Sequence, residues 1–140
     1  GALYGRSATT IDNCTFSSNQ SVSTGGALIN RAPTTITNSL FADNKSTTGD
    51  GGAAYISYSS GLIQNSTFTG NEAGENGGAI NGRSLRIDGC VVSGNTAGTE
   101  AGTTDGTGGG IHFYGGLELT NTIITGNSSD RGGGIGTDYG

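Results

Sequence analysis

Apolar side chains recur in this chain at fixed positions of a repeated segment, where they alternate with polar residues. Five segments align without gaps: TTIDNCTFSSN, TTITNSLFADN, GLIQNSTFTGN, LRIDGCVVSGN and LELTNTIITGN. The aligned columns are Ile11, Ile36, Ile63, Ile87 and Leu119; Phe16, Phe41, Phe68, Val92 and Ile124; and Asn19, Asn44, Asn71, Asn95 and Asn127. A period of two is typical of strands, and no window has the spacing of an amphipathic helix, so the chain is predicted to be all-β.

A second element, a glycine pair followed by small and aliphatic residues, falls between these segments. It occurs as GGALI at Gly25, GGAAY at Gly51, GGAIN at Gly77, GGGIH at Gly108 and GGGIG at Gly132, and GALYG at Gly1 is a shorter copy. The period of roughly 25 residues is too short for a unit that contains a helix, but it accommodates three short strands and three turns. The pattern predicts a β-solenoid, namely a single-stranded, right-handed parallel β-helix of about 5.5 rungs.

The repeat assigns residues 1–140 to one β-helix domain. Its predicted rungs are 1–24, 25–50, 51–76, 77–107 and 108–131, followed by a partial rung, 132–140. Successive rungs of such a fold lie about 4.8 Å apart, so each aligned column becomes a ladder along the axis, and the aliphatic and phenylalanine columns fill the core. The fourth rung is the longest, which predicts a protruding loop over residues 96–107.

Three other columns are expected to mark the corners between strands. Asn19 and its equivalents are predicted to form a structural ladder, in which asparagine adopts the left-handed conformation and bonds to the next rung. A second corner column consists of Asn13, Asn38, Asn65 and Asn121, interrupted by Gly89. The glycine pairs are expected at the third corner, where a positive φ or a close backbone approach excludes a Cβ.

The two elements together resemble the paired tetrapeptides of the polymorphic outer-membrane protein repeats of bacterial surface proteins. They stand here as GGAL, GGAA, GGAI, GGGI and GGGI, and as FSSN, FADN and FTGN with the variants VSGN and ITGN. The resemblance covers essentially the whole chain. It implies a right-handed parallel β-helix and an exported adhesin, of which this chain would be a passenger or stalk segment.

Composition and charge exclude two classes of partner. The formal net charge is -5, and the six lysine and arginine residues are scattered, which argues against nucleic-acid binding. No apolar run is long enough to cross a bilayer, so this segment is not expected to insert into a membrane. A near absence of lysine, with abundant small polar residues, favours an extracellular or outer-cell-surface location.

The columns supply no obvious catalytic or metal-binding group. Asp12 and Asp88 share a column but lie three rungs, about 14 Å, apart, too far for the carboxyl pair of a glycosidase. His112 is the only histidine, so neither a histidine metal cluster nor a histidine triad with a second imidazole is possible. Arg86 and Glu118 on neighbouring rungs are expected to form a surface ion pair. We therefore expect no catalytic, cofactor-binding or metal-binding residue, no cofactor and no enzyme activity.

Cys14 and Cys90 also share a column three rungs apart. Because a disulfide requires Cα atoms within about 7 Å, these cysteines are not expected to pair. They are instead predicted to be free, buried thiols that fill small inward positions.

One outward strand face carries the candidate ligand residues. Its column reads Tyr4, Ile29, Tyr55, Asn81, His112 and Gly136. Tyr4, Tyr55, His112 and the nearby Tyr114 present planar groups that suit a sugar or a partner protein. A second outward column, Thr15, Leu40, Thr67, Val91 and Ile123, is unusually apolar for an exposed strand, which favours association with a lateral neighbour.

Three functions are consistent with these features. The first is a structural and adhesive extracellular solenoid that contacts flanking rungs and a host-surface protein or glycan. The second is a filament subunit that self-associates end to end, since the terminal rungs carry no cap. The third is a carbohydrate-binding or polysaccharide-degrading β-helix, which rests on the Tyr4, Tyr55 and His112 face.

Overall fold

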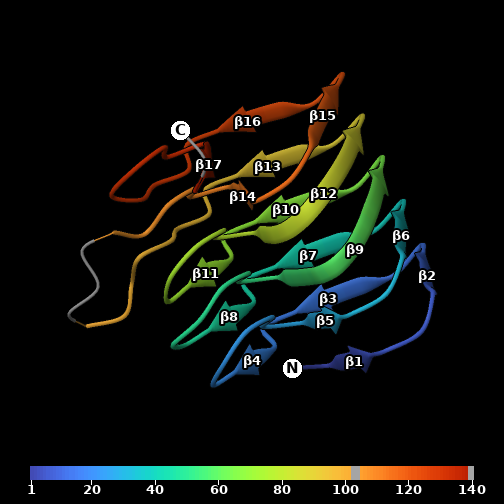
Figure 1. Ribbon diagram of the computed structural model, residues 1–140, viewed down its shortest axis with the longest axis horizontal. Coiled ribbons are helices and arrows are strands. Elements are labelled where there is room, and N and C mark those ends of the chain that lie inside the picture. Colours follow the sequence, from blue (N-terminus) through green and yellow to red (C-terminus); the bar gives the residue numbers. More distant parts are fainter. Residues whose placement is uncertain (102–104, 139–140) are drawn as a thin grey trace.

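The computed structural model describes residues 1–101 and 105–138, and Figure 1 shows short strands stacked in successive rungs. The first sheet has the order β1-β5-β9-β12-β14-β17, with β2, β6 and β15 paired alongside. Its strands are β1 (Leu3–Gly5), β2 (Thr9–Asp12), β5 (Leu28–Asn30), β6 (Thr34–Thr37), β9 (Ala54–Gln64), β12 (Ile80–Asp88), β14 (Ile111–Phe113), β15 (Leu117–Thr120) and β17 (Ile135–Thr137).

Two smaller sheets lie alongside the first, one with five strands and one with three. The second sheet consists of β3 (Thr15–Ser17), β7 (Leu40–Ala42), β10 (Thr67–Thr69), β13 (Val91–Ser93) and β16 (Ile123–Thr125). The third sheet consists of β4 (Gln20–Ser21), β8 (Lys45–Ser46) and β11 (Glu72–Ala73). The pairings are parallel in all three sheets. The predicted all-β solenoid of parallel strands is therefore confirmed.

The aliphatic column lies in the core in the predicted register. Its members pair rung by rung in the order Ile11, Ile36, Ile63, Ile87 and Leu119. The first four are buried, whereas Leu119, on the last rung of this ladder, is 37% exposed. Burying one such side chain contributes about 1.5–3 kcal/mol, so this ladder is a main source of stability.

The phenylalanine column forms a second core ladder. The rings of Phe16 and Phe41, and those of Phe41 and Phe68, stack with centroids 4.8 Å apart and nearly parallel planes. Val92 and Ile124 continue the column on the next two rungs. Ring spacing matches the distance between rungs because each phenylalanine occupies the same position of its strand.

The corners confirm two of the three predicted backbone conformations and correct the third. The second asparagine column and the first glycine of each pair have positive φ angles, 51° at Asn13 and 60° at Gly25 for example. In the ladder column, however, the left-handed residue is the one before the asparagine, with φ of 53° at Ser18 and 54° at Asp43. The ladder asparagine is instead selected for the hydrogen bonds of its amide.

The predicted structural ladder of Asn19, Asn44, Asn71, Asn95 and Asn127 is present. Each Oδ1 from Asn44 onward accepts hydrogen bonds from the backbone N–H and the Nδ2 of the asparagine one rung earlier, at 2.9–3.0 Å. From Asn44 onward, each Nδ2 also donates to a backbone carbonyl of a core strand. Asn71 Nδ2, for example, donates to Phe41 O at 3.0 Å. The corner is thereby satisfied without water, because Asn44, Asn71 and Asn95 are fully buried.

The long fourth rung leaves the solenoid later than predicted. Thr96 bridges Glu72 and Ser128 on the neighbouring rungs, and the chain keeps ladder hydrogen bonds as far as Glu100, whose N–H donates to Gly74 O. Thr107 again bridges the next rung. The predicted loop 96–107 is therefore too long at both ends, because Thr96 to Glu100 and Thr107 still pair with neighbouring rungs. Residues 102–104 of this segment lie outside the described part.

The two cysteines are free, but they are not both buried. Cys90 is 1% exposed, as predicted, whereas Cys14 is exposed. The prediction for Cys14 was wrong because its column is covered on one side only: Ser39 follows it on the next rung, and no described rung lies on the other side.

Candidate ligand-binding face

The first sheet bends within each rung, between the strand after the glycine pair and the strand with the aliphatic column. In β9 and β12 the chain passes through this bend as one strand, and Figure 1 shows both as long, curved ribbons. Ile56 pairs with Gly82 before the bend and Ser60 pairs with Ser84 after it, but β9 has residues 57–59 between them where β12 has only Arg83. The bend therefore varies in length while the strands on both sides keep their register.

Three tyrosines gather at this bend. Tyr55 and Tyr114 are half-buried and close enough for each to affect the pKa of the other, and Tyr58 lies nearby and is 73% exposed. Burial, then the neighbouring Tyr55, raises the pKa of Tyr114 to about 12. Burial, then the charge of Asp50, raises the pKa of Tyr55. Both phenols stay neutral at physiological pH and offer ring faces and hydroxyls to a ligand.

Tyr58 was not predicted from the sequence, whereas Tyr4, the third predicted tyrosine, lies in the predicted column but apart from this cluster. It pairs with Ile29, which pairs with Tyr55, so it is two rungs from Tyr55. Its ring is 55% exposed, its hydroxyl accepts a hydrogen bond from Arg6 Nε at 2.7 Å, and the Arg6 guanidinium lies 5.5 Å from its ring centroid. Tyr4 therefore extends the face along the axis.

His112 is in the predicted column but is 1% exposed, so its prediction as a surface ligand residue was wrong. Asn81 Nδ2 lies 3.0 Å from His112 Nδ1, and Asp138 Oδ1 lies 3.1 Å from Nε2. With the amide as donor, Nδ1 is the acceptor and Nε2 donates to the carboxylate. The Tyr114 ring lies 6.4 Å away. Strand alternation points His112 outward, but Asn81 and Asp138 cover its edges.

A half-buried carboxyl group, Asp50, lies beside the same cluster. Its Oδ1 accepts hydrogen bonds from the backbone N–H and the Nδ2 of Asn76, both at 3.0 Å. Burial raises the pKa of Asp50, and these two hydrogen bonds lower it less than burial raises it. Asn81 Oδ1 and Ser57 Oγ are buried without a hydrogen-bond partner in the described part of the chain, so the polar groups of this region are not all satisfied internally.

An arginine column runs along the bend and was missed from the sequence. One column of paired residues consists of Gly5, Asn30, Ile56 and Gly82. An arginine directly follows three of these four residues: Arg6, Arg31 and Arg83. All three arginines are exposed. Aligning the residues just after the outward tyrosine column would have revealed this spacing.

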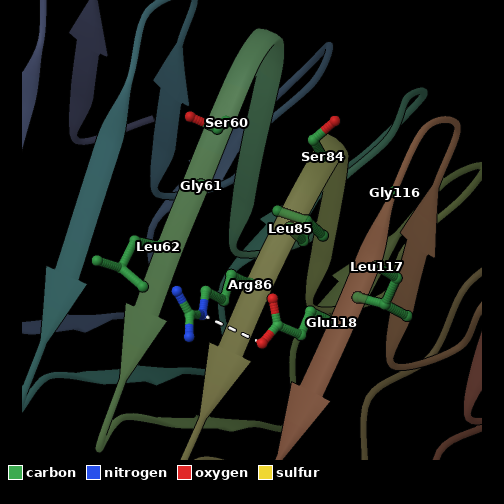
Figure 2. Close-up of a pocket in the computed structure, with 9 residues that line it drawn as sticks. All are labelled: Ser60, Gly61, Leu62, Ser84, Leu85, Arg86, Gly116, Leu117 and Glu118. Carbon is green, nitrogen blue, oxygen red and sulfur yellow. Dashed lines mark ion pairs between the residues drawn. The ribbon is translucent and has the colours of Figure 1, made fainter.

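Next to the bend, a groove of about 450 Å³ opens over β9, β12 and β15. It is lined by Ser60, Gly61, Leu62, Ser84, Leu85, Arg86, Gly116, Leu117 and Glu118. Figure 2 shows the Arg86 side chain lying between Leu62 and Glu118, and Arg86 Nε is 3.4 Å from Glu118 Oε1, which confirms the predicted ion pair. Both side chains are more than half exposed, so this pair contributes less than about 1 kcal/mol.

Two carboxylates near the bend and the groove already have hydrogen-bonding or ionic partners. Asp50 and Glu118 are each engaged by a neighbour, with Asn76 and Arg86 respectively. Among the residues described here, no group of three or more histidine, cysteine, aspartate or glutamate side chains is placed to hold a metal ion. Neutral phenols, exposed guanidinium groups and serine hydroxyls beside an open groove are the groups that recognise polar, extended ligands.

Stacked parallel strands, core ladders and an asparagine corner ladder define this protein as a parallel β-solenoid. The family described as "Right handed beta helix region" matches residues 2–140, and the chain belongs to this family. No curated protein and no solved structure matches the chain significantly. Within the described ranges, no helix is long and apolar enough to cross a membrane.

Proposed function

We propose that this chain is an adhesive segment of an exported bacterial surface protein, and that it binds glycan without cleaving it. The GGA(I/L/V) and FxxN elements support membership of the polymorphic outer-membrane protein repeats, and with it a location outside the cell. The solenoid would act as a rod that presents the bend and its groove to a host or neighbouring surface.

The gathering of Tyr55, Tyr58 and Tyr114 beside the groove carries the proposal. Tyr58 precedes the groove residue Ser60 by two positions, and Tyr114 precedes the groove residue Gly116 by two, so both tyrosines lie next to the groove along the chain, on two different rungs. Sugar rings stack on such aromatic faces, and serine hydroxyls and backbone groups supply hydrogen bonds. Gly116 leaves its part of the groove open, because a Cβ at this position would have no atom within 4 Å.

Binding of the purified chain to a panel of soluble polysaccharides, measured by calorimetry, tests the proposal. Tyr58→Ala removes an exposed ring without opening the core, and we expect it to weaken binding about 2- to 10-fold. Val22→Ala is the matched control, because Val22 is 75% exposed and follows β4 in the third sheet. Equal affinities of the wild type and Tyr58→Ala would contradict the proposed face.

The absence of cleavage is tested with the same panel. We expect no new chain ends after prolonged incubation of any polysaccharide with the protein, assayed as reducing ends and as unsaturated ends. Cleavage of any polysaccharide that persists after contaminating enzymes have been removed would overturn the non-catalytic part of the proposal.

A further inference from the structure

We propose that the glycan bound at this face is anionic, and that Arg31 and Arg83 read its carboxylate or sulfate groups; this inference rests on the proposed function. The chain as a whole carries a net charge of -5, so it repels polyanions in general. Four of its six basic residues nevertheless lie at the bend or in the adjoining groove: Arg6, Arg31, Arg83 and Arg86. The positive charge is therefore local to the candidate face.

Arg31 and Arg83 differ from the other basic residues in the contacts of their side chains. Lys45 pairs with Glu72, Arg86 with Glu118 and Arg131 with Asp105, and Arg6 bonds to Tyr4. Neither the Arg31 nor the Arg83 guanidinium has an ion pair or a side-chain hydrogen bond in the described part of the chain, and both are exposed. Their donors are free to bind a ligand.

Three carboxylates of the bend region and the adjoining groove are already engaged. Glu118 is paired with Arg86, Asp138 accepts from His112, and Asp50 accepts from Asn76. Burial also raises the pKa of Asp50, which disfavours its charged form. An anionic ligand at the bend therefore meets two arginines without an ion-pair partner. The three carboxylates named above each already have a partner.

The spacing of the two arginines fits a polymer that runs along the solenoid axis. Arg31 and Arg83 follow residues of one column that are two rungs apart, so their backbones are separated by about 10 Å. Between them, the bend of the intervening rung carries the exposed Tyr58. The order cation, ring, cation suits a chain of sugars that carries acidic groups at intervals, because a guanidinium binds carboxylate or sulfate with two parallel hydrogen bonds.

Paired polysaccharides that differ only in charge test this inference. We expect polygalacturonate to bind and its fully methyl-esterified form to bind at least tenfold more weakly, or dextran sulfate to bind and dextran not. The first result assigns carboxylate groups and the second assigns sulfate groups to the ligand. Affinity should fall as the salt concentration rises, because dissolved ions screen the attraction between the arginines and the anionic polymer.

Single substitutions test whether Arg31 and Arg83 bind the acidic groups of the polymer. Arg31→Gln and Arg83→Gln are each expected to weaken binding of the anionic polymer about tenfold and to reduce its salt dependence, since each removes a charge-assisted contact. Lys45→Gln, in the third sheet, removes the same charge elsewhere and should leave affinity unchanged. All three side chains are at the surface, and circular dichroism checks that each variant is folded.

Each remaining outcome decides one of the two proposals. Equal binding of charged and uncharged polymers, unaffected by either arginine variant, would overturn the anionic inference and leave glycan binding intact. Tighter binding of single-stranded DNA than of any polysaccharide would overturn the assignment to glycan. Failure of every polysaccharide to bind would overturn the proposed function together with this inference.

Discussion

Asn71→Ala removes the middle side chain of the asparagine ladder and tests what holds the rungs together. Asn71 Oδ1 accepts from the N–H of Asn44 at 2.9 Å and from its Nδ2 at 3.0 Å. Asn71 Nδ2 donates to Phe41 O at 3.0 Å and to Asn95 Oδ1 at 2.9 Å. Asn44, Asn71, Phe41 and Asn95 are 0–1% exposed, so water does not replace the four lost hydrogen bonds.

The expected cost follows from those four bonds. The buried N–H of Asn44 loses its acceptor, which costs about 1–3 kcal/mol, and the other lost bonds bring the total to about 4 kcal/mol. Asn19→Ala is the matched control. The Asn19 side chain is half-buried and makes one ladder bond, from Nδ2 to Asn44 Oδ1 at 2.9 Å, while its backbone N–H keeps the same acceptor. Its loss should cost about 1 kcal/mol.

Urea unfolding followed by circular dichroism measures the two free-energy changes. Because a stack of repeats can open locally, amide hydrogen exchange at Asn44 and Phe41 gives a second, site-specific readout. We expect the Asn44 amide to exchange much faster in Asn71→Ala than in Asn19→Ala. Equal destabilisation by the two substitutions, with unchanged exchange at Asn44, would refute the assignment of stability to the buried amide ladder.

The remaining predictions concern a buried carboxyl group, a glycine and the two thiols. Burial raises the pKa of Asp50, so the folded state holds this proton more tightly than the unfolded state, and stability falls as the pH rises above 3.8. Asp50→Asn should remove this fall and be more stable than the wild type at pH 7; equal urea midpoints at pH 7 would contradict it. A Cβ on Gly52 would lie 2.0 Å from a carbonyl oxygen of the next rung, whereas one on Gly94, at a φ of 63°, meets nothing within 4 Å. Gly52→Ala should therefore cost more than about 3 kcal/mol and Gly94→Ala about 1 kcal/mol, and similar thermal midpoints would count against this reasoning. A thiol reagent should label exposed Cys14 in the native protein but Cys90 only after unfolding, because burial covers Cys90 and raises its pKa; equal rates would show that Cys90 is accessible.

The register of the solenoid could be predicted from the sequence because equivalent residues make the same contact on every rung. Ile63 pairs with Ile87 and Phe41 stacks on Phe68, so each column is repeated evidence for one environment. The ion pair of Arg86 with Glu118 followed from the same alignment. A column identifies which residues are neighbours and which side of the strand they occupy.

A column does not determine exposure, and the wrong predictions share this cause. His112 points outward but is covered by Asn81 and by Asp138, which lies 26 residues further along the chain. Cys14 occupies an inward column but is exposed, since only one neighbouring rung packs on it. Filament assembly and lateral association through the Leu40 column stay predictions, because no described contact tests them.

The position of the candidate face in the fold explains why its residues can differ from rung to rung. Ladder positions such as Asn71 are constrained by hydrogen bonds to the rungs on both sides, so a change there affects three rungs. At the bend the constraint is weaker: β9 and β12 differ by two residues between Ile56 and Ser60, and their pairing resumes in register on the far side. Each rung can therefore place an arginine, a tyrosine or a serine at the bend without disturbing the core. A ligand surface built at this position can change while the solenoid beneath it stays the same, so the bend is where we expect binding specificity to reside.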